Sequence, residues 1–333
     1  MRTGRGRARG LTWRPTFGLK CLVIGAAMLL GPIAKAETIT VGLVGAASST
    51  HWPIYIGLKK GYFADEDLQL DMVFVQSSAA MVQQLTAGAL NVALSTGLAD
   101  PLRAIDKGSP IAIVRIEMQA PPYAILAKPS IKRMTDLKGK VISIGGVKDI
   151  TRIYLERMLA PSGVKPGDYD TVYAGATAAR FSALQGGAVD AAVLLPPFNF
   201  YAESSGFNNL GLTIDYAKEL PFSGSVVNRA WATSHKAALD KLLSALSRSV
   251  AWYYDPANRA EAIKIMVEAS RLSEEDITKT YDFIHGRNFF EDTGKVSVAK
   301  MNAMLAALKE LGDIEGSVAL DRFVLPGVTQ LTD

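Results

Sequence analysis

A short loop rich in hydroxyl side chains follows an alternating apolar run at 38–44, a pattern typical of a β-strand. The helical spacing of Ile54 and Leu58 predicts that this loop leads directly into a helix. Hydroxyls and free backbone N–H groups would then lie at the end of a sheet strand, where open α/β folds bind small molecules. The same residues could serve simply as helix N-caps. The candidate ligand-binding residues of this loop are Ser49, Thr50, His51 and Trp52.

Two of these residues carry rings, and each has two interpretations. His51 could donate a hydrogen bond to an anionic ligand or act only as a cap at the start of the helix. Trp52 could stack on an aromatic ligand or cover an alkyl chain, or it could be a rim aromatic that fills the surface of a lobe. Further aromatic side chains that would suit an aromatic carboxylate or sulfonate are Tyr123, Phe198 and Tyr201.

The pattern of hydroxyls at a strand end returns further along the chain. A short apolar strand at 91–94 ends on Ser95 and Thr96, which we expect at the same edge of the sheet as the first loop. Two weaker candidates, which follow expected strands at 171–173 and 191–195, are Thr177 and Pro197.

A glycine pair at 145–146 separates an expected strand at 141–144 from an expected helix at 149–159. Such a turn exposes unpaired N–H groups and the positive end of the helix dipole, which suits a carboxylate or sulfonate. The spacing matches neither a P-loop nor a dinucleotide-binding fingerprint. Lys148 could neutralise the anion or be a solvated surface charge. The candidates here are Gly146, Lys148, Asp149 and Thr151.

Two acidic residues indicate that the ligand could instead carry a positively charged or amino group. Glu117 or Asp149 could pair with an ammonium or amino group of a ligand. Glu117 could equally be a hinge carboxylate that pairs with Arg115 or with solvent. Helix N-termini and hydroxyl loops favour a small organic anion, but an amino-substituted heterocycle stays open.

These candidates must be positioned by an α/β framework. Strands and helices alternate from residue 38 to the strand at 191–195, which predicts parallel βαβ units. A Pro-Pro pair at 121–122 interrupts the alternation, so we place a crossing between two lobes there. A strand at 222–227 would return the chain, and amphipathic helices follow whose Met and Leu stripes are expected in the core. The expected domains are lobe I at 37–118 and 223–333, and lobe II at 119–222.

The N-terminal segment has the composition of a secretory signal. Residues 1–36 hold seven of the 36 basic residues and none of the 32 acidic ones, around a short apolar core, with a small-residue cleavage site before Glu37. Residues 37–333 therefore carry 29 basic and 32 acidic side chains, a net charge of −3. The positive net charge of the full chain, +4, comes from the signal segment, so no nucleic-acid partner is expected.

The only cysteine, Cys21, lies in that segment. The exported chain would therefore have no disulfide, no thiolate metal site and no cysteine nucleophile. We expect no cofactor and no metal.

Three sequence blocks carry a resemblance to a known family. They are a hydroxyl loop leading to Lys60-Gly61-Tyr62-Phe63, an Asp-Leu-Lys-Gly-Lys block at 136–140, and an Ala-Ala-Arg block at 178–180 that continues to Val189-Asp190-Ala191-Ala192. In this order the chain resembles the periplasmic substrate-binding proteins of ABC importers in the nitrate/taurine/sulfonate group. The resemblance covers about residues 38–310 and implies a two-lobed type II periplasmic binding fold. Departures fall in the ligand loops, where Lys148 and Asp149 replace small hydroxyl residues.

The resemblance implies a periplasmic, monomeric protein that closes around a small organic anion and delivers it to the transmembrane subunits of a permease. A thiamine-pyrimidine precursor is the alternative ligand. One similar family, the thiamine-pyrimidine synthase, is an enzyme that uses a cysteine-rich motif, a pyridoxal phosphate lysine and a consumed histidine. Residues 37–333 have no cysteine and only three histidines, and they show no catalytic-triad or metalloprotease spacing, so we expect no enzyme.

Overall fold

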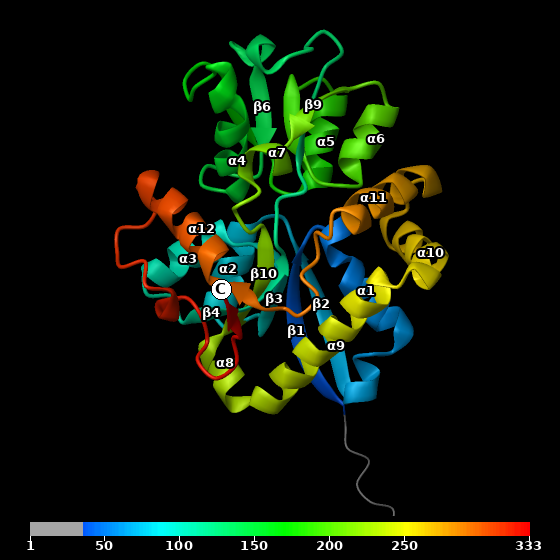
Figure 1. Ribbon diagram of the computed structural model, residues 1–333, viewed down its shortest axis with the longest axis vertical. Coiled ribbons are helices and arrows are strands. Elements are labelled where there is room, and N and C mark those ends of the chain that lie inside the picture. The colour runs from blue at the N-terminus through cyan, green and yellow to red at the C-terminus, as the bar shows by residue number, and fades with distance from the viewer. Residues whose placement is uncertain (1–35) are drawn as a thin grey trace, which may run out of the picture. The chain divides into compact units, whose positions relative to one another are not determined.

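Two five-stranded β-sheets organise the structure, a computed structural model that describes residues 36–333 (Figure 1). The expected signal at 1–36 lies, except for Ala36, outside the described residues and stays a prediction. Each sheet is mixed and mostly parallel, and helices flank it. The predicted α/β fold class is therefore confirmed.

The first sheet has the strand order β2-β1-β3-β10-β4. β1 is parallel to β2 and β3, whereas β10 is antiparallel to both of its neighbours. Nearly every residue of β3, β4 and β10 is buried. β3 and β10 are inner strands, and β4, the last strand of the order, is joined at Ile113 to Val324 by an isolated bridge. The strands are β1 (Glu37–Val44), β2 (Leu68–Val75), β3 (Val92–Gly97), β4 (Ile111–Met118) and β10 (Ser223–Asn228).

The second sheet repeats this layout with the order β7-β6-β8-β5-β9. β6 is parallel to β7 and β8, and β5 is antiparallel to β8 and β9. The strands are β5 (Ala124–Ala127), β6 (Val141–Ile144), β7 (Asp170–Tyr173), β8 (Ala191–Leu194) and β9 (Asn208–Leu212).

The chain passes between the two sheets twice. It leaves the first sheet after β4 and enters the second at β5, and it returns from β9 to β10. The connecting segments are 119–123 and 213–222. We propose these crossings as the boundaries of lobe I (37–118 and 223–333) and lobe II (119–222).

Helix ends follow local sequence signals. Pro53 stands in the first turn of α1, and Gly61, with a φ of 76°, ends it. Ser273 caps α11 by accepting a hydrogen bond from the backbone N–H of Asp276, as the sequence predicts. The helices are α1 (Trp52–Lys60), α2 (Ser78–Thr86), α3 (Ala99–Asp106), α4 (Ile150–Leu159), α5 (Thr177–Gln185), α6 (Phe198–Ser204), α7 (Ile214–Ala217), α8 (Arg229–Ser234), α9 (Lys236–Tyr254), α10 (Arg259–Ser270), α11 (Glu274–Gly286) and α12 (Val298–Glu310); two short strands, β11 (Val296–Ser297) and β12 (Leu331–Thr332), pair with each other.

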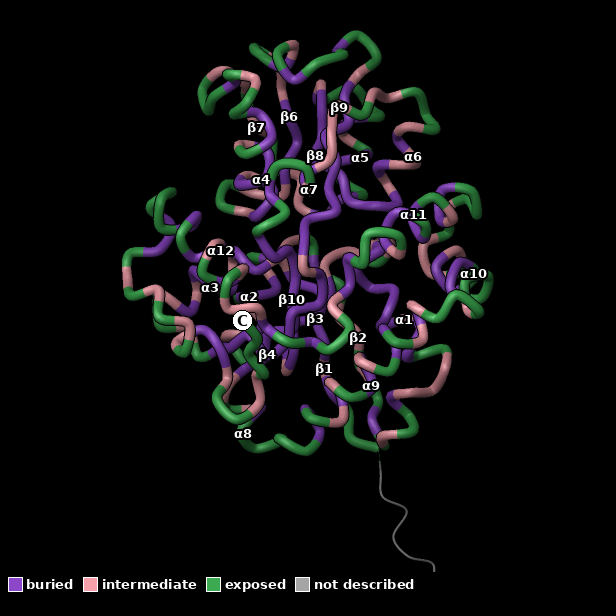
Figure 2. The backbone as a smooth tube through the Cα atoms, in the orientation of Figure 1, coloured by how far each residue is buried: buried purple, intermediate pink, exposed green. Residues whose placement is uncertain are grey.

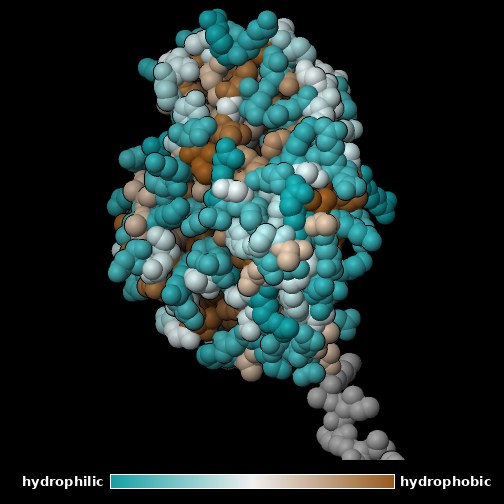
Figure 3. Space-filling view, turned by 45° about the vertical axis from the view of Figure 1, so that its right-hand side comes forward, coloured by the Kyte–Doolittle hydropathy of each residue, from teal (hydrophilic) through white to brown (hydrophobic). Residues whose placement is uncertain are grey.

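Buried residues run along the strands of both sheets and the inner faces of the helices (Figure 2). The stripe of α12 that was expected in the core, including Met301, Met304 and Leu308, is buried. Leu311, which follows the end of α12 at Glu310, is 37% exposed and lies outside this stripe. Polar side chains cover most of the face seen in Figure 3. Within residues 36–333, no helix has the length and apolar character that a membrane span requires.

Candidate functional site

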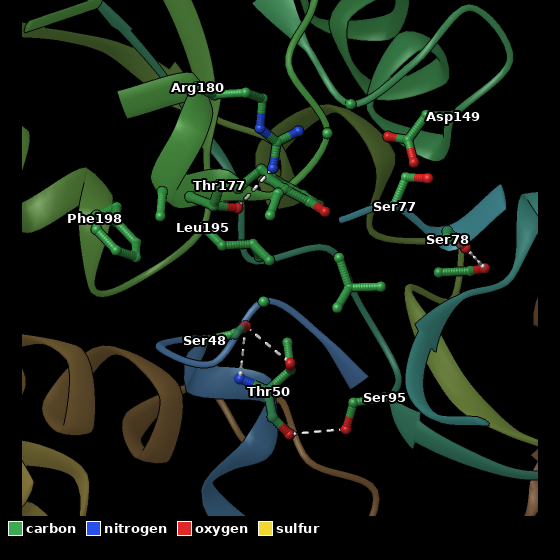
Figure 4. A pocket seen from close by; sticks show the side chains of 18 of the residues that line it. Ser48, Thr50, Ser77, Ser78, Ser95, Asp149, Thr177, Arg180, Leu195 and Phe198 are labelled. Carbon is green, nitrogen blue, oxygen red and sulfur yellow. Dashed lines mark hydrogen bonds between the residues drawn. The ribbon is translucent and has the colours of Figure 1, made fainter. Parts of the chain in front are cut away.

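A cavity of about 680 Å³, counting the space at its open mouth, lies between the two lobes (Figure 4). Its walls are the loops and helix starts that follow the parallel strands β1, β2 and β3 on one side and β6, β7 and β8 on the other. The carboxyl ends of parallel strands meet at one edge of a sheet, so the topology of each lobe directs these loops to the same place.

Hydroxyl side chains are prominent in the lobe I wall, and Figure 4 shows them in two groups, with Ser48, Thr50 and Ser95 below and Ser77 and Ser78 to the right. Ser48 accepts a hydrogen bond from the backbone N–H of Thr50, and the two hydroxyl oxygens are 2.9 Å apart. Ser77 accepts from the N–H of Ala80 and so caps α2. Ser48 and Ser77 therefore each cap a helix and also line the cavity, so the two roles do not exclude one another. The hydroxyl residues that line the cavity from lobe I are Ser48, Thr50, Ser77, Ser78 and Ser95.

Ser95 is held in place by a buried carboxylate. Its backbone φ is +52°, which is uncommon for a residue other than glycine. Oε1 of Glu117 accepts hydrogen bonds from the Ser95 N–H (3.0 Å) and the Ser225 hydroxyl (2.5 Å), and the Ser95 hydroxyl donates to the Thr50 carbonyl oxygen (2.9 Å). Glu117 is therefore behind the cavity wall, where it positions Ser95. Glu117 does not line the cavity, and Arg115 donates instead to the Ser247 hydroxyl and the Glu291 carbonyl oxygen.

Arg180 brings a buried positive charge to the lobe II wall. Its side chain, on α5, is 3% exposed, and Nη2 donates to Oγ1 of Thr177 at 2.6 Å, as Figure 4 shows. Nε is buried without a partner, and no carboxylate of residues 36–333 lies within 4.0 Å of the guanidinium. Burying an unpaired cation is costly, so this geometry favours a ligand that supplies the missing acceptors.

Aromatic side chains from the two crossings form the side of the cavity near the hinge. The rings of Tyr123 and Phe222 are 5.1 Å apart in an edge-to-face arrangement, and both line the cavity. Burial raises the pKa of Tyr123, so its hydroxyl stays neutral. The guanidinium of Arg180 lies 5.6 Å from the Tyr123 ring. Phe198 and Leu195 add apolar surface from lobe II.

Asp149 changes the expected electrostatics of the glycine loop. Its Oδ1 accepts hydrogen bonds from the N–H (2.9 Å) and the hydroxyl (2.5 Å) of Thr151. The positive end of α4 is thus already occupied by a carboxylate of the chain itself. This geometry does not favour the predicted anion site at the helix end, which stays a prediction. Asp149 nevertheless lines the cavity, as predicted.

Four other predicted residues of lobe II do not line the cavity. Nζ of Lys148 is 2.9 Å from Oδ1 of Asp313, outside the cavity, because that buried carboxylate attracts it. Thr151 is fully buried, and Oγ1 also accepts from the N–H of Gly145. Gly146 and Pro197 are not among the lining residues, whereas their neighbours Gly145 and Phe198 are.

Four predicted residues of lobe I are likewise not cavity-lining. The Trp52 ring is fully buried, and its indole N–H donates to the Ala262 carbonyl oxygen at 2.7 Å, so it belongs to the core. Burial lowers the pKa of His51 to about 4, and its ring packs edge-on to Tyr55 instead of lining the cavity. Two hydroxyl residues, Ser49 and Thr96, are also fully or almost fully buried behind the wall.

Four predicted residues therefore do line the cavity: Thr50, Ser95, Asp149 and Thr177. The prediction missed Arg180 although its signal was visible, since it stands three residues after Thr177 on one helix, and residues with this spacing share a face. Ser77 and Ser78, a hydroxyl pair that follows β2, also line the cavity and are not among the predicted site residues. Tyr123 and Phe198, two of the aromatic candidates, do line the cavity, whereas Tyr201 packs on Phe181 with ring centroids 5.0 Å apart.

No group of three or more potential metal ligands occurs in the described part of the chain.

Comparison with known proteins decides the family. Residues 48–260 match the family described as "NMT1/THI5 like". The chain belongs to the NMT1/THI5-like family. A formylaminopyrimidine-binding protein of Halalkalibacterium halodurans is 29% identical over 139 residues, which is 41% of each chain. The 4-amino-5-hydroxymethyl-2-methylpyrimidine phosphate synthase THI12 of Saccharomyces cerevisiae is 25% identical over 150 residues, 44% of this chain and 43% of that one.

These matches span about two fifths of the length of the curated relatives. Over almost the whole chain, the NMT1/THI5-like fold is similar to the alkanesulfonate-binding protein SsuA of Xanthomonas axonopodis pv. citri, solved with bound MOPS. The TM-score is 0.72 at 16% identity, with 90% of this chain and all of the other covered. The predicted resemblance to the binding-protein fold of the nitrate and sulfonate group is confirmed.

Proposed function

We propose that this chain is a solute-binding protein that captures a small organic ligand between its lobes and delivers it to an ABC importer. The observation that carries the proposal is the cavity itself, whose walls come from the strand ends of both lobes. A ligand that contacts both walls favours the closed arrangement by its differential affinity, and a permease can recognise that arrangement. The chain would be exported by its N-terminal segment, act in the periplasm as a monomer, and meet the transmembrane subunits there.

The ligand class that the geometry supports best is an organic anion with an apolar or aromatic body. Arg180 supplies an uncompensated charge, and Thr177 fixes its orientation. A planar guanidinium binds a carboxylate or sulfonate through two parallel hydrogen bonds. Phe198 and Phe222 would contact the body of the ligand, and the hydroxyl wall of lobe I would complete the acceptor and donor set.

Asp149 favours a second candidate, an aminopyrimidine. This carboxylate faces the cavity and could accept a hydrogen bond from an exocyclic amine, while the arginine donates to a ring nitrogen or a carbonyl group. The pyrimidine names of the two curated relatives support this alternative. An enzyme of the synthase type is less well supported, because residues 37–333 contain no cysteine for the cysteine-rich motif of that group.

A thermal-shift screen of the chain separates the ligand classes. The panel would hold an alkanesulfonate, taurine, an aromatic carboxylate and 4-amino-5-hydroxymethyl-2-methylpyrimidine. A ligand at a hundredfold excess over Kd stabilises the fold by about 2.7 kcal/mol, a shift of a few degrees in Tm for a chain of this size. A selective shift with the alkanesulfonate or the aromatic carboxylate supports an organic anion as the ligand. A selective shift with the pyrimidine supports the aminopyrimidine.

Two variants test whether the cavity is the binding site. Arg180→Gln should weaken anion binding roughly 10- to 100-fold, whereas Asp149→Asn should weaken pyrimidine binding and spare the anion. Arg157→Gln, an exposed arginine on α4, is the matched control and should change neither. Binding that survives both cavity variants unchanged would contradict the site. Turnover of the pyrimidine or a covalent pyridoxal adduct would contradict the non-enzymatic function.

A further inference from the structure

Asp313, which follows α12 in lobe I, collects three positively charged side chains outside the cavity. Oδ2 lies 3.2 Å from Nη1 of Arg103 and 3.0 Å from Nη2 of Arg152. Oδ1 lies 2.9 Å from Nζ of Lys148. Only 2% of the Asp313 side chain is exposed, so these interactions are much less screened than ordinary surface pairs.

The cluster joins the two lobes. Asp313 and Arg103, on α3, belong to lobe I, whereas Lys148 and Arg152, at the start of α4, belong to lobe II. Arg103 also donates a hydrogen bond across the boundary to the backbone carbonyl of Lys148. One buried carboxylate therefore anchors the beginning of a lobe II helix to lobe I.

Two further carboxylates balance the charge. Asp100 is 2.5 Å from Nη2 of Arg103, and Oε1 of Glu156 is 3.7 Å from Nε of Arg152. Three acidic and three basic side chains then form one network, and each buried charge has an opposite partner. A network of this kind is worth more than isolated exposed ion pairs.

The anchored helix start is also part of the cavity wall. Asp149 and Ile150 line the cavity, and they stand between Lys148 and Arg152 in the sequence. Ile150 packs closely on lobe I, because a methyl group added to Gly97 would lie 3.1 Å from its Cγ2 atom. The position of this segment relative to lobe I thus affects the cavity and the charge cluster together.

We propose that Asp313 is a positioning residue for ligand binding: by holding the start of α4 against lobe I, it stabilises the closed arrangement of the lobes. This inference depends on the proposed function in one respect, namely that closure of the two lobes serves ligand binding. The cluster itself does not depend on which ligand binds.

A distance measurement between the lobes tests this proposal without a ligand. The single cysteine makes site-specific labelling simple: Cys21→Ser removes it, and Lys107→Cys and Lys165→Cys place spin labels at exposed sites of lobe I and lobe II. Double electron–electron resonance on the full chain then reports the separation. Lys148→Gln with Arg152→Gln should lower the ratio of closed to open molecules roughly tenfold.

Salt provides a second arm. At 1 M salt the Debye length is about 3 Å, but the pairs of Asp313 are buried and little screened, so the parent chain and the double variant should both keep their low-salt distributions. Asp313→Asn removes the same pairs from the lobe I side and should give the same distribution, while circular dichroism checks that each variant is folded.

Lys138→Gln is the matched control, because it breaks the pair between Lys138 and Asp168 inside lobe II. It should leave the distances unchanged. Identical distributions for parent and double variant at low and high salt would overturn the proposal. Because no ligand is present, failure of the ligand assignment would not change this readout.

Discussion

A methyl group on Gly175 would lie 2.4 Å from the backbone carbonyl oxygen of Gln76. Gly175 follows β7 in lobe II, and Gln76 follows β2 in lobe I, so the two lobes meet here backbone to backbone. The φ of Gly175 is +66°, a conformation that also favours glycine. Both the backbone conformation and the space therefore require the absence of a side chain at this position.

Gly175→Ala should hinder closure of the lobes. The clash with Gln76 exists only when the lobes are together, so ligand affinity should fall about tenfold or more, and the interlobe distance should increase. Gly163→Ala is the matched control, since Gly163 has a φ of +68° but nothing within 4 Å of the added methyl group. Both variants should lose about 1 kcal/mol of stability from backbone strain, but only the first should lose affinity. Equal affinities for the two variants would contradict the interlobe contact.

Glu117→Ala should destabilise lobe I and disturb the cavity wall. It leaves the Ser95 N–H and the Ser225 hydroxyl buried without their acceptor, at a cost of about 2–3 kcal/mol in the free energy of unfolding. Glu117→Gln keeps a carbonyl oxygen for these donors and should restore most of the stability. Urea unfolding measures both. A similar loss in the two variants would show that the charge, and not the acceptor, is what matters.

Trp52→Phe should lower stability without affecting ligand binding. The smaller ring loses the hydrogen bond to the Ala262 carbonyl oxygen and leaves a gap beside Tyr253 and Tyr281, whose rings are 5.3 and 5.7 Å away. We expect a loss of about 2–3 kcal/mol in urea unfolding. Trp231→Phe, at a half-buried site on α8, is the control and should cost less. A selective loss of affinity in Trp52→Phe would restore its sequence-based interpretation as a ligand contact.

His51 should make the fold less stable as the pH falls. Its pKa in the folded chain is about 4, below the ordinary value of 6.5, because burial disfavours the charged ring. The unfolded chain therefore takes up a proton first, and stability is lost as the pH falls from 6.5 to 4, by up to about 3 kcal/mol. Urea unfolding at several pH values measures this slope. His51→Gln should have a shallower slope over the same range, and an unchanged slope would show that other groups are responsible.

The strands were the most predictable part of the fold. The expected strand at 141–144 coincides with β6, because its apolar run ends directly at the glycine pair 145–146. β9 was not predicted, since Asn208, Asn209 and Gly211 are unfavourable in strands and pairing with β5 overrides that preference. The α6 and α7 helices are too short to show a clear helical period.

The candidate site was predictable at the level of loops but not of side chains. Strand-end reasoning selected the correct loops, yet Trp52 turns into the core while Ser48, four residues earlier, lines the cavity. That choice depends on α10, which lies far away in the sequence and supplies the acceptor for the indole. The partner of Lys148 is equally remote, because Asp313 follows the last long helix. Long-range partners of this kind leave no local pattern.

The pairing of β4 with β10 gives lobe II a simple relation to lobe I. Met118, the last residue before the first crossing, pairs with Ser223, the first residue after the second, in neighbouring antiparallel strands. The whole of lobe II thus occupies the place of the turn in a β-hairpin. A tight turn that joins these two residues would close the hairpin and preserve the strand order of the first sheet. Lobe I is therefore a natural candidate for a minimal scaffold, into which other inserted domains could be grafted at the same point.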